Sequence, residues 1–191
     1  MSITIATVYQ KTSPLLGRLT LRPMDPQQDT PEIYRWVTQP YARYWGMMDK
    51  TCEAVLAEYA LIHHQEHACA LIGSVNGKMA FLCECYDPAH DLIGHYYKAE
   101  PGDVGMHILM GPPETPIAGF TWEVFTFVMD YLFENSRYQR VVVEPDINNE
   151  KIHRLNRKAG FIYQQTVQLP HKTAALAFCT RQQYIFSKQN N

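Results

Sequence analysis

One stretch of the sequence, residues 103–161, constrains the fold more than any other part of the chain. Its pattern predicts a strand (104–110), a proline-rich loop (111–119), an amphipathic helix (120–133), a second strand (140–145) and a short polar helix ending at Lys158-Ala159-Gly160-Phe161. The first amides of a helix lack internal partners, and the helix dipole adds partial positive charge there. A strand that runs through a loop into a helix therefore indicates an anion-binding site.

The rest of the chain extends this stretch into a mixed, mostly antiparallel sheet flanked by helices. A core strand is predicted at 18–24, and Asn76-Gly77 between two apolar runs indicates a hairpin. Helix starts are predicted at 29–32 and 49–53, and two strands with a short tail helix follow Phe161. We expect an α/β (α+β) fold with about seven strands. A single domain should span residues 1–191, with residues 1–17 as an extension that contains a short strand.

Charge and cysteine content argue against several classes of protein. The net charge of −2 gives no reason to expect a nucleic-acid partner, and no apolar run reaches the roughly 20 residues that span a bilayer. The N-terminus lacks a basic segment followed by a long apolar run, so no signal peptide is expected. The five cysteines are odd in number and irregularly spaced, which favours a reducing cytoplasm over a disulfide framework.

Two groups of metal-ligating residue types are interpreted as structural. Cys83 and Cys85 place two thiols on one face of a strand, but without a second cysteine pair nearby apolar packing is favoured. His63 and His67 are spaced i, i+4 with His64 between them. Without a carboxylate partner, a solvated helix end is favoured for them. No metal cofactor is expected.

Two titratable residues are candidate catalytic groups. His107 lies in the middle of strand 104–110, on the same face as Gly105, and an imidazole with an ordinary pKa of about 6.5 is an available base near neutral pH. The alternative is a buried core histidine. Asp146 follows the second strand, where α/β sheets place ligands, and could orient His107, accept a proton or hold an ammonium. Its alternative is the N-cap of the next helix. Glu144 is the weaker candidate and could be a surface residue at the strand end.

The segment that closes the stretch carries a family resemblance. Residues 149–161 read Asn-Glu-Lys-Ile-His-Arg-Leu-Asn-Arg-Lys-Ala-Gly-Phe. This resembles the pattern N-x-x-A-x-x-L-Y-x-K-x-G-F of the GCN5-related N-acetyltransferases (GNAT), which take an acyl group from coenzyme A. The resemblance implies two parallel strands splayed into a V around the pantetheine arm, and a loop around the diphosphate. The cofactor-binding residues that it implies are Ile108, Leu109, Met110, Pro116, Ala118, Gly119, Phe120, Thr121, Asn149, Arg154 and Arg157.

The sequence departs from the family pattern at two places. The diphosphate loop of the family usually reads R/Q-x-x-G-x-G/A, whereas loop 112–119 keeps only Gly119 and has no basic residue. Positive charge would have to come from elsewhere, with Arg154, Arg157 and Lys158 as candidates. Asn156 stands where most members have a tyrosine that protonates the leaving thiolate. An amide can only donate a hydrogen bond to the sulfur.

Further segments resemble one branch of this family, the acyltransferases of hydroxamate siderophore biosynthesis. The matching segments are 105–113, 118–121, 140–146 (Arg-Val-Val-Val-Glu-Pro-Asp), 149–161 and 168–174 (Gln-Leu-Pro-His-Lys-Thr-Ala). The branch acylates hydroxylysine or N-hydroxylated putrescine or cadaverine. The resemblance implies that His107 and Asp146 form the acceptor site, with Asn156 near the sulfur. It also implies acetyl-CoA or succinyl-CoA as the donor, with no metal, and a hydroxamate product that chelates ferric iron.

Three residues are candidate contacts of the substrates. Trp45 lies in the aromatic-rich segment 41–48, which could line a pocket or cap the core. Glu144 offers a carboxylate for the remote ammonium of the acceptor. Lys172 lies between the last two predicted strands, where it would contact coenzyme A or an acidic acyl group, or else lie in a solvated turn.

The sequence thus predicts an acyl-CoA-dependent N-acyltransferase that acts on a small N-hydroxylated amine. One alternative is a family member that acylates an ordinary amine, such as an aminoglycoside, a polyamine or a protein. The other is a module that binds acyl-CoA without catalysis.

Overall fold

The computed structural model describes residues 6–113 and 115–190. Contacts divide the chain into two compact units, one made of residues 1–84 and 108–128 and the other of residues 85–107 and 129–191. None of the described helices is both long enough and apolar enough to cross a membrane.

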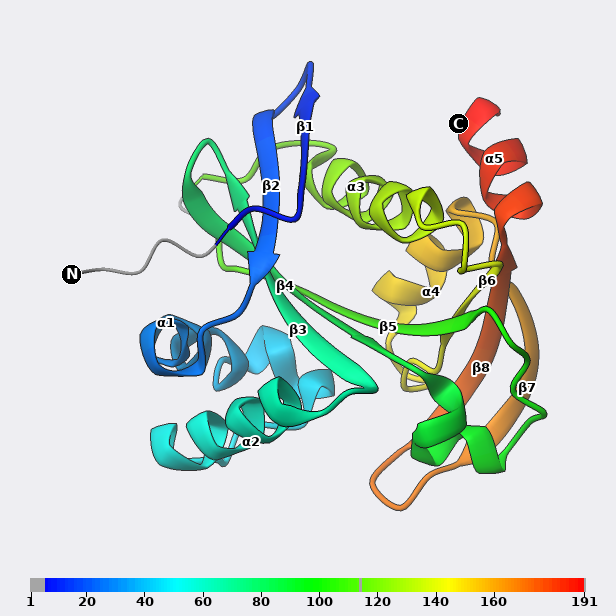
Figure 1. The fold of residues 1–191 in the computed structure, drawn as a ribbon, viewed down its shortest axis with the longest axis horizontal. Helices are drawn as coiled ribbons and strands as arrows, with labels where there is room; N and C mark the ends of the chain where they lie inside the picture. Colours follow the sequence, from blue (N-terminus) through cyan, green and yellow to red (C-terminus); the bar gives the residue numbers. More distant parts are fainter. Residues whose placement is uncertain (1–5, 114, 191) are drawn as a thin grey trace. The chain divides into compact units, whose positions relative to one another are not determined.

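Eight strands occur in the described residues, in the hydrogen-bonded order β1-β2-β3-β4-β5-β6-β8-β7 (Figure 1). Their bounds are β1 Tyr9–Ser13, β2 Gly17–Pro23, β3 Ala68–Val75, β4 Lys78–Tyr86, β5 Asp103–Met110, β6 Arg140–Val143, β7 Ile162–Gln168 and β8 Thr173–Thr180. The pair β5–β6 is parallel, and β1–β2, β2–β3, β6–β8 and β7–β8 are antiparallel. This confirms the predicted mixed, mostly antiparallel sheet. The extension supplies the eighth strand, β1.

The helices follow the predicted order, with one change of boundary. Their bounds are α1 Pro26–Val37, α2 Cys52–His64, α3 Phe120–Glu134, α4 Glu150–Lys158 and α5 Arg181–Gln189, with short 3-10 helices η1 Pro40–Trp45, η2 Pro88–His90 and η3 Leu92–His95. Helix α1 begins earlier than predicted, because Asp25 is its N-cap. The Asp25 side chain accepts hydrogen bonds from the backbone amides of Gln27 and Gln28. Asp29, the first residue of the predicted start, is instead held by Arg22 at 2.6 and 2.7 Å.

The first unit has a core where α1 and α2 pack against each other and against β3 and β4 (Figure 1). Its fully buried members include Ile33, Trp36, Val55, Tyr59, Ile72 and Leu82. Burial of each large apolar side chain contributes about 1.5–3 kcal/mol. This core includes Leu82 of β4, the strand in which the first segment of this unit ends at Glu84 and the second unit begins at Cys85.

The second unit is organised by the parallel pair β5–β6. The pair starts at Asp103 with Arg140, whose side chains form an ion pair at 2.7 Å, and its last register pair is Gly105 with Val142. Strand β6 ends at Val143, before Pro145, which has no N–H to continue a ladder. Strand β5 runs on to Met110. The second half of β5 therefore extends beyond its parallel partner.

Candidate active site

His107 and Glu144 meet where the parallel pairing ends. His107 lies on β5 beyond the last register pair, and Glu144 directly follows β6. The imidazole Nε2 lies 2.6 Å from the Glu144 Oε1. The Glu144 side chain is only 5% exposed, whereas the His107 side chain is 37% exposed. The arrangement is thus a reachable imidazole with a buried carboxylate behind it.

Glu144 also binds two further groups, from two other segments of the second unit. The Tyr86 hydroxyl, at the end of β4, donates a hydrogen bond to Glu144 Oε2 at 2.7 Å. The Lys172 ammonium, from the loop between β7 and β8, lies 3.4 Å from Oε1. Burial acts to raise the pKa of Glu144, but the charge and hydrogen bond of His107, the charge of Lys172 and the Tyr86 hydrogen bond together lower this pKa to about 2. The carboxylate is therefore ionised at neutral pH.

Glu144 can hold the His107 ring in one orientation and tautomer, as the carboxylate of a hydrolase triad does for its histidine. An Nε2–H donated to the carboxylate leaves the lone pair of the neutral ring on Nδ1, which can then accept a proton. The carboxylate also stabilises the imidazolium that forms. The pKa of Tyr86 is raised well above its ordinary value, by burial first and by Glu144 second, so its hydroxyl remains a donor.

Asp146 has other contacts than His107. Its carboxylate accepts hydrogen bonds from the backbone and side-chain amides of Asn148, at 2.8 and 3.0 Å. It is not the N-cap of α4, because that position belongs to Asn149. The carboxylate that orients His107 is thus Glu144, and a role for Asp146 in holding the acceptor stays a prediction. Glu144 is buried, so the interpretation of this residue as a surface strand end is wrong.

Asn156 belongs to a buried network on α4 and β7. His153 Nε2 lies 3.0 Å from the backbone oxygen of Asp146, so this nitrogen carries the proton and Nδ1 accepts from the Tyr163 hydroxyl at 2.7 Å. The Tyr163 oxygen in turn accepts from Asn156 Nδ2 at 3.2 Å. Asn156 is fully buried, and its Oδ1 has no partner among the described residues. One amide hydrogen of Asn156 is therefore used within the protein.

The residues predicted to bind coenzyme A lie at the end of β5, in the loop that leads into α3, at the start of α3 and on α4. Ile108, Leu109 and Met110 form the end of β5, and of these only Leu109 is buried. The loop residues Pro116, Ala118 and Gly119 are exposed, and Phe120 and Thr121 begin α3. Gly119 has a φ of +83°, which glycine adopts at no steric cost. An exposed backbone that leads into a helix start suits an anion such as a diphosphate.

On α4, the predicted contacts divide between a cap and two exposed cations. The Asn149 side chain accepts from the Ile152 amide at 3.5 Å and caps the helix. Arg154 and Arg157 are exposed, and the Arg157 guanidinium lies 5.1 Å from the ring centre of Tyr163. Arg154 is thus accessible to a phosphate, whereas Arg157 partly covers the ring of Tyr163.

In the first unit, Trp45 belongs to a hydrogen-bonded chain. Its Nε1–H donates to the Tyr59 hydroxyl at 3.1 Å, and that hydroxyl donates to Glu84 Oε1 at 3.0 Å. Trp45 is half-buried at the end of η1. It therefore packs on the core and also presents part of its surface to solvent.

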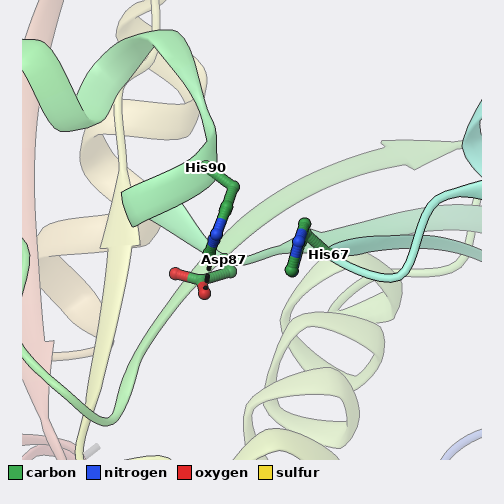
Figure 2. Close-up of side chains that lie close together, drawn as sticks. All are labelled: His67, Asp87 and His90. Carbon is green, nitrogen blue, oxygen red and sulfur yellow. Dashed lines mark hydrogen bonds and ion pairs between the residues drawn. The ribbon is translucent and has the colours of Figure 1, made fainter.

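The two cysteines set aside in the sequence are buried, and two of the three histidines lie at a helix end. Cys83 and Cys85 are buried in β4 as free thiols. His63 and His64 are exposed in the last turn of α2, as expected of a solvated helix end, but His67, also exposed, lies beyond the helix and just before β3, so the prediction is wrong for this residue. In the connection between β4 and β5, His90 Nδ1 lies 3.0 Å from an Asp87 carboxylate oxygen (Figure 2).

Residues 25–169 match the family model of the acetyltransferase (GNAT) domain. The chain belongs to the GNAT acetyltransferase family. This membership makes it an acyltransferase by family and fits the order of its strands and helices. The matched range includes His107, Glu144, Asp146 and Asn156 and ends before Lys172.

The names of two curated relatives of this acetyltransferase refer to N-hydroxylated amines. It is 29% identical, over 93% of its length, to the N(6)-hydroxylysine O-acetyltransferase of Escherichia coli. It is 28% identical, over 82% of its length, to the N-hydroxyputrescine acetyltransferase of Acinetobacter baumannii. The chain spans 57% of the first relative's length and 75% of the second's.

Solved structures share the fold of this acetyltransferase. An uncharacterized protein from Bacillus halodurans superposes with a TM-score of 0.87 at 23% identity, covering 97% of this chain and 98% of that one. The aminoglycoside acetyltransferase AAC(6')-Ib, in complex with ribostamycin and coenzyme A, gives a TM-score of 0.77 at 23% identity, covering 87% and 96% of the two chains.

Sequence reasoning missed three side chains of the site. Tyr86, His153 and Tyr163 are not among the candidate residues that the sequence indicates. A signal for Tyr86 exists in hindsight, since Gly105 in a buried strand indicates close approach of another group. For His153 and Tyr163 the sequence gives no signal, because their contact depends on how α4 crosses β7.

Proposed function

We propose that this acetyltransferase transfers an acetyl or succinyl group from coenzyme A to the hydroxylamine nitrogen of a small N-hydroxylated amine. The acceptor is an N-hydroxylated cadaverine or putrescine, or N6-hydroxylysine. The product is a hydroxamate, which is the iron-chelating group of a siderophore. The curated names of the relatives support this class of acceptor.

The observation that carries the proposal is the 2.6 Å contact of His107 with the buried Glu144. A hydroxylamine nitrogen is largely unprotonated at neutral pH, so it needs only a modest base. His107 takes the proton that the nitrogen loses when the C–N bond replaces the C–S bond, and the thiolate leaves. Glu144 balances the positive charge that develops on the imidazole.

The name of the Escherichia coli relative, an O-acetyltransferase, places the acyl group on oxygen, whereas the name of the Acinetobacter baumannii relative does not state the acylated atom. We assign the transfer to nitrogen, since a neutral hydroxylamine nitrogen is a better nucleophile than a neutral hydroxyl. The two products are easily told apart. A hydroxamate keeps its N–OH group and gives a coloured ferric complex, whereas an O-acyl hydroxylamine does not.

Thiol release from acetyl-CoA tests the proposal with N-hydroxycadaverine, N-hydroxyputrescine and N6-hydroxylysine against the parent amines. We expect turnover with at least one hydroxylamine and at least a tenfold lower kcat/KM for its parent amine. Ferric colour should appear in step with thiol release. Equal rates with hydroxylamine and amine would reject the proposal in favour of an ordinary amine acetyltransferase. Thiol release without ferric colour would move the transfer to oxygen.

Donor binding is measured separately by thermal unfolding with acetyl-CoA and succinyl-CoA. A ligand at 100 times its Kd stabilises the folded protein by about 2.7 kcal/mol. The donor that raises the Tm more is expected to be the one turned over. If neither donor raises the Tm, the atypical loop 111–119 does not hold coenzyme A, and the proposed donor is wrong.

A further inference from the structure

We propose that Lys172 is a positioning residue that sets the charge of His107: its ammonium neutralises the Glu144 carboxylate, so that His107 can lose its proton near neutral pH. The catalytic meaning of this inference rests on the proposed function. Its test does not, because the protonation of an imidazole can be measured without any substrate.

The backbone around β8 brings Lys172 to Glu144. Beyond the end of β6, the Ala175 amide donates to the Pro145 oxygen at 2.9 Å, and the Ile147 amide donates to the Thr173 oxygen at 3.1 Å. The start of β8 therefore stays paired with the residues that follow Glu144. The Lys172 side chain is only 16% exposed, although its ammonium is 3.4 Å from the carboxylate. A lysine this far buried is not the solvated turn residue that the sequence allowed.

Charge balance explains why a base at this position needs a cation nearby. An opposite charge within about 4–6 Å raises the pKa of an imidazole, by one to three units in partly buried sites. A lone Glu144, at 2.6 Å, would therefore keep His107 as imidazolium, which cannot take a proton. With Lys172 in place the pair Glu144–Lys172 has no net charge. The imidazole then keeps the orientation that the Glu144 carboxylate gives it. Its charged form, the imidazolium, is stabilised less than a lone carboxylate would stabilise it.

Other titratable groups of this unit act on Glu144 or on Tyr86 without replacing Lys172. Tyr86 contacts the carboxylate from β4, but it is a neutral donor. Asp91, at the start of η3, and Tyr97, before β5, act electrostatically on Tyr86, and Asp91 would add negative charge. Among the contacts described for Glu144, Lys172 thus provides the lysine ammonium that can offset the charge of the carboxylate.

The test is an NMR titration of the histidine side chains in 15N-labelled protein, with His107 assigned from the signals that disappear in His107→Ala. In Lys172→Met, we expect the midpoint of His107 to rise by about one pH unit or more. In Glu144→Gln, the Lys172 ammonium remains but the carboxylate is gone, so the titration midpoint of His107 should fall. Lys172→Arg should keep the wild-type midpoint, as should Lys151→Met, which removes one exposed charge from α4.

The opposite shifts separate charge balance from a structural role. A Lys172 that only packs the loop would change the unfolding midpoint in urea and leave the His107 titration where it is, and that result overturns the inference. A similar shift in Lys151→Met would also overturn it, because the effect would then be long-range. If Lys172→Met does not fold, Lys172→Gln takes its place. Failure of every hydroxylamine to react refutes the proposed function and leaves the titration result standing.

Discussion

The ring of Tyr86 fills the space beside Gly105 in which a side chain would otherwise lie. A Cβ built on Gly105 would come within 2.1 Å of the Tyr86 ring. This close approach places the Tyr86 ring 5.1 Å from the ring centre of His107 and its hydroxyl 2.7 Å from Glu144. Glycine at 105 is therefore required by packing and not by an unusual backbone angle, since its φ is not positive.

Gly105→Ala is expected to destabilise the protein by about 1–3 kcal/mol, the usual cost of overpacking a core. It should also lower turnover, because the displaced Tyr86 ring pushes on both Glu144 and His107. Unfolding in urea measures the first effect and thiol release the second.

A double-mutant cycle tests whether the destabilisation by Gly105→Ala comes from a clash with Tyr86. In a Tyr86→Ala background, the added methyl group of Gly105→Ala has room, so its cost should shrink by at least half. Equal costs in both backgrounds would mean that the two residues are independent.

His107→Ala is expected to lower kcat by at least a hundredfold, within the range that a positioned acid or base contributes. The Kd for acetyl-CoA, measured by calorimetry, should change little, because the imidazole acts on the acceptor. His63→Ala, at the exposed end of α2, is the control. A variant that loses donor binding but turns over bound substrate normally would contradict the role of His107 as base.

Glu144→Gln and Asp146→Asn compare the two acids after β6. Because Glu144 contacts the imidazole, Glu144→Gln should lower kcat by tenfold or more at pH 7. If Asp146 holds the remote ammonium of the acceptor, Asp146→Asn should raise KM instead. A larger loss of kcat in Asp146→Asn would show that the family resemblance identified the more important acid.

The low pKa of Glu144 predicts how stability responds to acid. Because the folded-state pKa of about 2 lies below the ordinary value of 4.5, this carboxylate stabilises the protein fully above pH 4.5. The contribution is lost as the pH falls from 4.5 towards 2. The difference in unfolding free energy between wild type and Glu144→Gln should be about 3 kcal/mol at pH 7 and shrink below pH 4.5. A difference that stays constant down to pH 2.5 would argue against a depressed pKa.

Tyr163→Phe tests the network of α4 and β7. Removal of the hydroxyl leaves His153 Nδ1 and Asn156 Nδ2 buried without this partner, at a cost of about 1–3 kcal/mol. Tyr96→Phe removes a hydroxyl with an exposed partner, the Gln168 carbonyl, and should cost less. Equal costs would mean that water already satisfies the buried groups.

The sequence by itself determined the elements and their order. Period-two alternation, the Asn76-Gly77 turn and the helix signals are local, so strands β2 to β8 and the helices could be predicted with small boundary errors. It also pointed to His107, because an imidazole in an apolar strand is conspicuous. The start of α1 was wrong because Asp25 and Asp29 both suit a cap, and only the position of Arg22 decides between them.

Only the tertiary structure decided which carboxylate contacts His107 and which groups contact that carboxylate. Glu144 and Asp146 are two residues apart, so no local rule tells which carboxylate turns towards β5. That choice follows from the end of the β5–β6 register and from Tyr86, which lies far away in sequence. Lys172 reaches the same carboxylate only because β8 pairs beyond the end of β6. Contacts between segments distant in sequence depend on register and burial, which a linear pattern does not contain.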